Sequence, residues 1–177
     1  MNCPAGLSGY HSYEAKVGKN TSSNIMTISI PEGLPRFEGE KVMIAVCGGL
    51  SARVLKGEDG ELSEIFSLRA PEIHYSDREM SFVSNSKGER LGSGGVMEQV
   101  DEKEKREFLS EFERLMAKEL ADAKFDRIYV LVPEYAAKEV LDVIPGAMAP
   151  RTVVAAYGNY LDQPDTKILR YIAESGY

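Results

Sequence analysis

A long stretch with helical periodicity, residues 101–124, constrains the fold of this chain more than any other feature. Its apolar residues recur at the i, i+4, i+7 spacing, which gathers them on one helix face turned toward a hydrophobic core. Asp101 and Glu104 have the spacing of a capping box, and Lys124 suits the negative end of the helix dipole, so we expect the helix to begin at Asp101. The stripe comprises Phe108, Phe112, Leu115, Met116, Leu120 and Ala123.

Three apolar runs ahead of this helix predict strands. Residues 42–47 are continuously apolar, as expected of a strand that is buried on both faces. Glycine-containing turns at 48–49 and 57–60 connect it to strands at 52–56 and 62–68, which gives an antiparallel meander. On the last of these strands we expect Leu62, Phe66 and Leu68 to share one face.

Strand and helix patterns alternate after the long helix. Residues 127–132 and 152–157 read as strands, residues 135–144 read as a helix, and a last helix starts near Asp162. A further short strand candidate, residues 24–30, ends at a proline. An antiparallel meander that is followed by alternating helices and strands predicts an α/β fold, in which three helices pack on a mixed sheet of about five strands. The right-handed crossover rule makes the last strands parallel to the first long one, a ribonuclease H-like arrangement.

Length and composition indicate one domain. The chain has 177 residues, of which 43% are hydrophobic and 28% charged, as is usual for a globular protein. Residues 1–24 are rich in Gly, Ser, Asn and Tyr without periodicity. We therefore expect a flexible N-terminal extension over 1–24 and a single α/β domain over 25–177, with Met26 as an alternative start.

Charge and cysteine content narrow the partners and the compartment. A net charge of -7 argues against general attraction to DNA or to an anionic membrane, because such binding needs a basic face. The sequence contains no run of about 18 apolar residues, so we expect no membrane span. The two cysteines, Cys3 and Cys47, are too few for a disulfide framework. We therefore expect the protein to be located in the reducing cytoplasm.

No pattern of catalytic or metal-ligating residues stands out. A metal-dependent nuclease of this topology needs a carboxylate within the first long strand, and residues 42–47 contain none. His11 and His74 have no partner at ligand spacing, and Cys47 at a strand end is typical of a small buried hydrophobe. We therefore expect no metal, no cofactor and no catalytic residue.

A glycine-rich segment ahead of the long helix is the best candidate for a binding site. Glycine at Gly92, Gly94 and Gly95 permits positive φ and lets another molecule approach the backbone closely, and Ser93 lies among them. No Lys-Ser/Thr pair follows, so a Walker-type phosphate loop is absent. Acidic residues that open the predicted helix would also neutralise its positive end.

Three short segments carry a resemblance to a known family. They read Ala-Val-Cys-Gly-Gly-Leu-Ser-Ala-Arg-Val-Leu at 45–55, Phe-Asp-Arg-Ile-Tyr-Val-Leu-Val-Pro at 125–133 and Gly-Asn-Tyr-Leu at 158–161. With the Asp-Gly hairpin at 59–60, they resemble bacterial host-attachment-type proteins. These are relatives of the middle domain of archaeo-eukaryotic class-1 release factors and of Pelota. The resemblance covers about residues 41–175 and implies a release-factor middle-domain-like fold.

This resemblance implies a role in translation without hydrolysis. In true release factors a Gly-Gly-Gln loop before the long helix supports peptidyl-tRNA hydrolysis. The matching residues here are Gly94, Gly95 and Val96, and a valine side chain offers no hydrogen bond to water or leaving group. Gln99 lies three residues further on. The resemblance thus implies a non-catalytic domain that binds ribosome or tRNA through residues 84–100, in ribosome rescue or stress.

The sequence is also compatible with a second function. The acidic net charge favours a protein–protein interaction module that keeps the fold without binding RNA. Basic residues around the loop, among them Lys87 and Arg90, favour ribosome or tRNA binding, although nearby acidic residues balance them.

Overall fold

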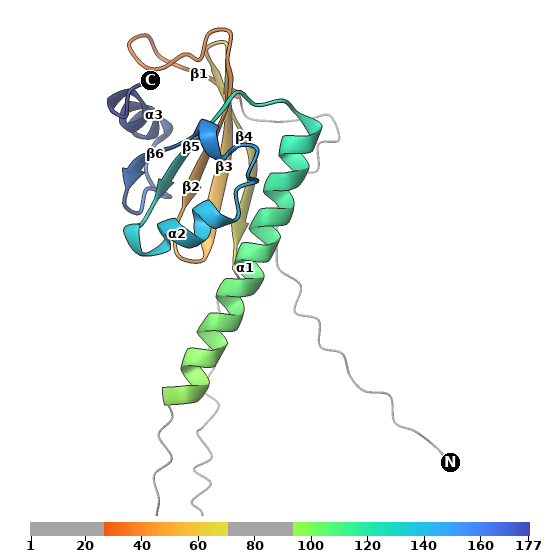
Figure 1. Ribbon diagram of the computed structural model, residues 1–177. Helices are drawn as coiled ribbons and strands as arrows, with labels where there is room; N and C mark the ends of the chain where they lie inside the picture. Colours follow the sequence, from red (N-terminus) through yellow and green to blue (C-terminus); the bar gives the residue numbers. More distant parts are fainter. Residues whose placement is uncertain (1–26, 71–93) are drawn as a thin grey trace, which may run out of the picture.

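The computed structural model describes residues 27–70 and 94–177, with side chains from residue 102 onward in the second range. Within these residues, six strands and three α-helices make an α/β fold, as the sequence predicts (Figure 1). The strands are β1 (Thr27–Ser29), β2 (Lys41–Cys47), β3 (Ser51–Glu58), β4 (Glu61–Arg69), β5 (Arg127–Val132) and β6 (Thr152–Tyr157). The helices are α1 (Gly94–Asp122), α2 (Glu134–Asp142) and α3 (Asp165–Glu174), with a 3-10 turn, η1 (Ala149–Arg151), before β6.

All six strands belong to one mixed sheet, in the order β1-β4-β3-β2-β5-β6. Strands β2, β3 and β4 form the predicted antiparallel meander, and β5 and β6 run parallel to β2. Both the meander and the parallel direction of the last strands are therefore confirmed. The sheet has one strand more than the expected five because β1 pairs antiparallel with β4 at the edge.

Helices cover both faces of the sheet, which places two apolar cores on either side of β2. Phe108 and Phe112 of α1 pack with α2 residues against one face, and Ile168 and Ile172 of α3 pack against the other. Strand β2 contributes alternate residues to the two cores, which explains why it is apolar throughout. The predicted stripe on α1 is confirmed, since its central residues are buried and Leu120 and Ala123 lie at the border of the same core.

Strand β4 switches the faces of its side chains partway along. Glu64 and Phe66 pair with adjacent residues of β3, so Ile65 is an extra residue in the ladder. Such a bulge reverses the alternation of side chains beyond it. Leu62 consequently packs on the α3 side, whereas Phe66 and Leu68 pack on the α1–α2 side. The expectation that these three share one face is wrong, because period-two counting assumes an unbroken ladder.

Helix α1 begins at Gly94, about two turns before the predicted start at Asp101. Asp101 is therefore an interior residue and not the N-cap, and the predicted capping box is wrong. The intervening residues include Met97, Glu98 and Gln99, which have high helix propensity and allow the helix to propagate toward its N-terminus. Glycine is costly mainly in helix interiors, so two glycines are tolerated in a first turn.

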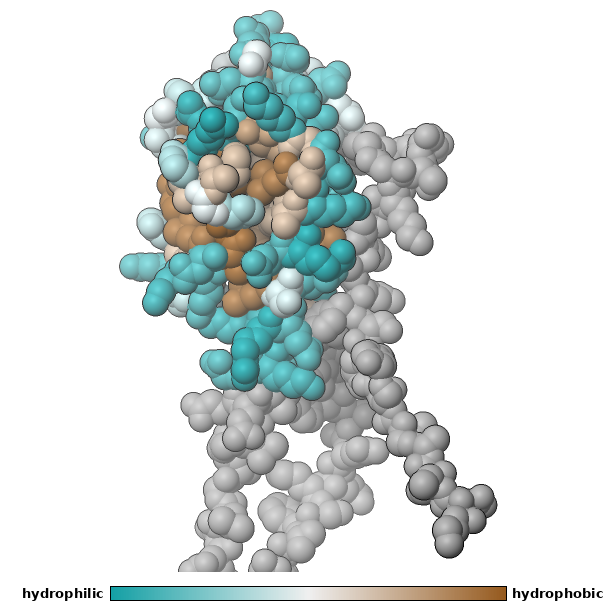
Figure 2. Space-filling view, turned by 45° about the vertical axis from the view of Figure 1, so that its right-hand side comes forward, coloured by the Kyte–Doolittle hydropathy of each residue, from teal (hydrophilic) through white to brown (hydrophobic). Residues whose placement is uncertain are grey.

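Several sequence-based expectations concern parts of the chain outside the described residues. They are the flexible extension over 1–24, the alternative start at Met26, the two histidines, and the first part of the 84–100 segment. Within the described part, partly buried apolar residues border both cores. Figure 2 shows that apolar surface reaches the solvent on one face, framed by hydrophilic residues.

Candidate functional site

The predicted binding segment enters the described structure at the N-terminus of α1. Gly94, Gly95 and Val96 form the first turn of the helix, and Gln99 lies in the second. The structure thus places these four residues in a helix and not in a loop. The remaining predicted site residues, Lys87, Arg90, Gly92 and Ser93, lie outside the described residues.

The early helix start changes the electrostatics of this end. The first backbone N–H groups of any α-helix have no acceptor within the helix, and they carry the positive end of the dipole. The first turn of α1 contains no acidic residue. Glu98 is about one turn from Gly94, Asp101 and Glu102 are about two turns away, and the dipole effect is strongest within the first turn. The expectation that acidic residues open this helix is therefore wrong.

The first part of α1 extends past the sheet (Figure 1). Lys105 joins α1 to another helix: its Nζ donates a hydrogen bond to Oε1 of Glu139 on α2 at 2.6 Å. This hydrogen bond raises the pKa of Lys105. Residues 94–104, which we call the projecting segment, precede this contact and span roughly 15 Å at the rise of an α-helix.

Residues of the segments that carry the family resemblance lie at the carboxyl ends of the parallel strands, where open α/β sheets usually bind ligands. The turn after β2 contacts the regions that follow β5 and β6. A Cβ on Gly48 would lie 2.5 Å from Cδ1 of Leu161, and one on Gly49 would lie 3.1 Å from the hydroxyl of Tyr135. Gly158 donates its backbone N–H to the carbonyl of Val132 at 3.0 Å.

The three segments that carry the family resemblance therefore meet at this edge, although they are far apart in the chain. Close contact explains the two glycines at 48–49, since larger residues would collide with Leu161 or crowd Tyr135. Sequence reasoning identified the segments but not their contact, and it placed Tyr135 only as the start of a predicted helix. Tyr135 is 75% exposed and offers an aromatic surface beside the turn.

Arg53, a charged residue that pairs with Val46 near the end of β2, has a structural role. Arg53 of β3 lies opposite Val46 and donates hydrogen bonds to Glu64 at 2.7 Å and to Asp165 at 2.7 Å. Burial lowers the pKa of Arg53, but the two hydrogen bonds outweigh it and the net pKa is raised. The guanidinium thus joins β3, β4 and the start of α3.

The described residues offer little chemistry for catalysis. Cys47 is fully buried, and burial raises the pKa of its thiol to about 12, which keeps it protonated and unreactive. The role of a small buried hydrophobe expected for Cys47 is confirmed. Within residues 27–70 and 94–177 no three His, Cys, Asp or Glu side chains are grouped as metal ligands.

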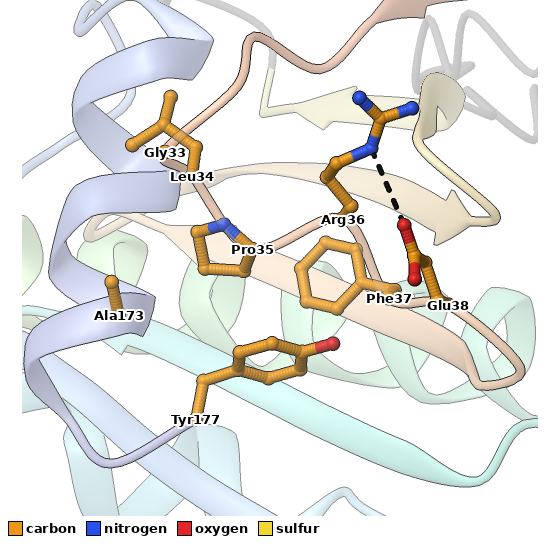
Figure 3. Close-up of a pocket in the computed structure, with 8 residues that line it drawn as sticks. All are labelled: Gly33, Leu34, Pro35, Arg36, Phe37, Glu38, Ala173 and Tyr177. Carbon is orange, nitrogen blue, oxygen red and sulfur yellow. Dashed lines mark ion pairs between the residues drawn. The ribbon is translucent and has the colours of Figure 1, made fainter.

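A cavity of about 410 Å³ lies on the α3 side of the sheet, between the segment that precedes β2 and the end of α3. Figure 3 shows Tyr177 facing Pro35 and Phe37, with Arg36 paired to Glu38. The Arg36–Glu38 distance is 3.8 Å, so the cation already has an acidic neighbour. The cavity has the size of a small-ligand site, and Arg36 Nε, the atom nearest Glu38, is buried without a hydrogen-bond partner.

Comparison with known proteins does not assign the chain to a family: no family model matches it, and no curated protein is similar to it in sequence. None of the helices in the described residues is long and apolar enough to span a membrane.

Proposed function

We propose that this protein is a non-catalytic, translation-associated domain that binds the ribosome or tRNA with the N-terminal end of α1 and the residues just before it. One observation carries this proposal: a glycine pair stands in the first turn of a helix that extends beyond the sheet. Free N–H groups and the helix dipole favour an anionic group at such an end, and glycine leaves room for its approach. A phosphate of RNA has this chemistry.

The proposal includes the ribonuclease H-like, release-factor-related fold and a cytoplasmic location. The order of antiparallel meander and parallel strands supports this relationship. So does the meeting of the three resemblance segments at one edge of the sheet. Because Val96 stands where the release-factor glutamine acts, the proposed role is binding without peptidyl-tRNA hydrolysis.

Co-sedimentation with ribosomes at low and high salt tests the proposal. We expect the wild type to bind at low salt and to dissociate as salt rises. Gly95→Asp places a carboxylate in the first turn, which suits the helix dipole but repels phosphate, so it should abolish binding. Ala117→Asp makes the same charge change at an exposed position further along α1 and should bind like the wild type. Absence of wild-type binding at low salt would refute the proposal.

Peptidyl-tRNA hydrolysis tests the alignment of the glycine pair. The wild type should be inactive, and a gain of activity in Val96→Gln alone would support the match to the release-factor loop. Robust release by the wild type would contradict the non-catalytic role.

A protein–protein interaction module is the second candidate. Residues 94–107 of α1 contain five acidic and three basic residues, a balance that opposes RNA. Apolar surface also reaches the solvent on one face (Figure 2), as is common at protein interfaces. Nuclease treatment separates the two candidates, because a protein partner stays bound after RNA is digested whereas ribosome- or tRNA-dependent association is lost.

A further inference from the structure

The cavity between residues 33–38 and the end of α3 has two chemically different sides. Arg36 and Glu38 lie together toward the right of the view in Figure 3, and the apolar lining lies toward the left and below. This apolar lining consists of Leu34, Pro35, Ala173 and the ring of Tyr177. Small-molecule sites usually combine a mostly apolar lining with a small number of polar groups in this way.

The segment that carries the two charges has a fixed backbone. Phe37 has a φ of 53°, in the left-handed region that a bulky residue rarely adopts. Its ring is fully buried beside Tyr129 and Tyr177, and the carbonyl of Arg36 accepts the N–H of Gly60 at 2.6 Å. Strained backbone persists only where surrounding contacts enforce it, and such positions are concentrated at ligand sites. The residues on either side of Phe37 are therefore presented to the cavity from an anchored chain.

Arg36 has hydrogen-bonding capacity that the described residues leave unused. Its Nε is buried and has no hydrogen-bond partner, since the distance of 3.8 Å to Oε1 of Glu38 is too long for a hydrogen bond. The side chain as a whole is 41% exposed, and within the described part of the chain the Glu38 pair is its one polar interaction. A guanidinium in this state favours a carboxylate, which it can bind through two parallel N–H groups.

Glu38 makes a simple anion a poor occupant of the cavity. Its carboxylate lies beside the Arg36 guanidinium and would repel an anion bound there. A simple cation would meet Arg36 in the same way. A molecule that carries a positive and a negative group close together satisfies both side chains at once.

We propose that this cavity binds a free α-amino acid with an apolar side chain. The carboxylate of the ligand pairs with Arg36, its ammonium group pairs with Glu38, and its side chain lies against the ring of Tyr177 and the neighbouring apolar lining. Both charged groups of an α-amino acid are attached to one carbon atom, which suits two protein charges that are themselves close together. This inference goes beyond the proposed function and is tested without ribosomes.

An NMR titration of the full chain with L-phenylalanine tests the proposal. Because the ligand is small and two exposed charges hold it, we expect saturable binding with a Kd of about 1 mM. The resonances that shift should be those of residues 33–38 and of the end of α3. L-phenylalanine amide lacks the carboxylate and N-acetyl-L-phenylalanine lacks the ammonium group, so each should bind roughly fivefold more weakly. No saturable binding of L-phenylalanine, shifts confined to other parts of the protein, or equal binding of either analogue would overturn the proposal.

Two variants assign the charges to their partners. Arg36→Gln should bind L-phenylalanine more weakly and should no longer distinguish it from its amide. Glu38→Gln should lose the distinction between L-phenylalanine and the N-acetyl analogue. Arg114→Gln removes an exposed arginine that pairs with Glu111 on α1, and it should bind all three compounds like the wild type.

The design remains decisive if one variant fails to fold. The side chain of Glu38 is 80% exposed, so Glu38→Gln is expected to fold like the wild type even if Arg36→Gln does not. Discrimination that is unchanged in either folded variant would contradict the proposed orientation of the ligand and overturn the proposal.

Discussion

Lys105 on α1 and Glu139 on α2 form an ion pair, with Nζ and Oε1 2.6 Å apart. The pair ties the base of the projecting segment to the helix that follows β5. Three residues further along α1, Phe108 enters the core, so the ion pair marks the boundary between the packed and the projecting parts of the helix.

Lys105→Met should destabilise the protein by about 0.2–1 kcal/mol, since solvent screens a pair whose side chains are 34% and 38% exposed. The raised pKa of Lys105 means that its contribution is fully present below the unfolded value of about 10.4 and is lost as pH rises through the folded pKa. Denaturant melts at neutral and alkaline pH measure this. Lys118→Met, at an exposed lysine without an ion pair in the described residues, is the control. A pH-independent difference would contradict the assignment.

Phe112→Ala should cost about 3–5 kcal/mol in the free energy of unfolding, because the ring is fully buried, lies parallel to Phe108 and meets Phe66 edge-to-face. Equilibrium denaturation provides the measurement. Glu113→Ala changes the adjacent, exposed residue and should alter stability by no more than about 0.5 kcal/mol. Similar losses in both variants would mean that the packing of α1 on the sheet differs from that described.

Gly57→Ala should destabilise by about 1–3 kcal/mol, since its Cβ would lie 2.5 Å from Cδ2 of Phe37, a fully buried ring. Gly146→Ala is a matched control, because its Cβ meets no atom within 4 Å and its backbone is not in the left-handed region. Thermal melts of the two variants should therefore separate clearly. Equal melting temperatures would indicate that Phe37 moves aside without cost.

Cys47 should not react with a thiol reagent near neutral pH while the protein is folded. Its burial and its pKa of about 12 both suppress the thiolate. The measurement uses a Cys3→Ser variant, so that Cys47 is the one remaining thiol, with a denatured sample as the control for full reaction. Rapid labelling of the native protein would show that the end of β2 opens to solvent.

Much of the fold follows from local patterns in the chain. The spacing of Phe108, Phe112 and Leu115 defines the buried face of α1, and the apolar run of β2 indicates burial on both sides. The parallel direction of β5 follows from the alternation of strand and helix, because a helix that crosses back over the sheet lets the next strand run parallel to β2. These features depend on residues a few positions apart or on the order of the elements, both of which a sequence contains.

Other features depend on partners distant in the chain, and the tertiary structure decided them. The extra residue Ile65 exists only relative to β3, so the opposite faces of Leu62 and Phe66 could not be read from alternation. The start of α1 was misplaced because a glycine pair and a capping-box pattern suggested an N-terminus at Asp101.

The candidate site shows the same division. Its glycine pair at Gly94 and Gly95 was visible in the sequence, while the extension of α1 beyond the sheet was not. The contacts of Gly48 with Leu161 and of Gly49 with Tyr135 also appear only in the fold. A sequence determines which segments become strands and helices because their periodicity is local. Which segments meet depends on the packing of the whole sheet, since contacts between distant residues form only when the strands that carry them are paired.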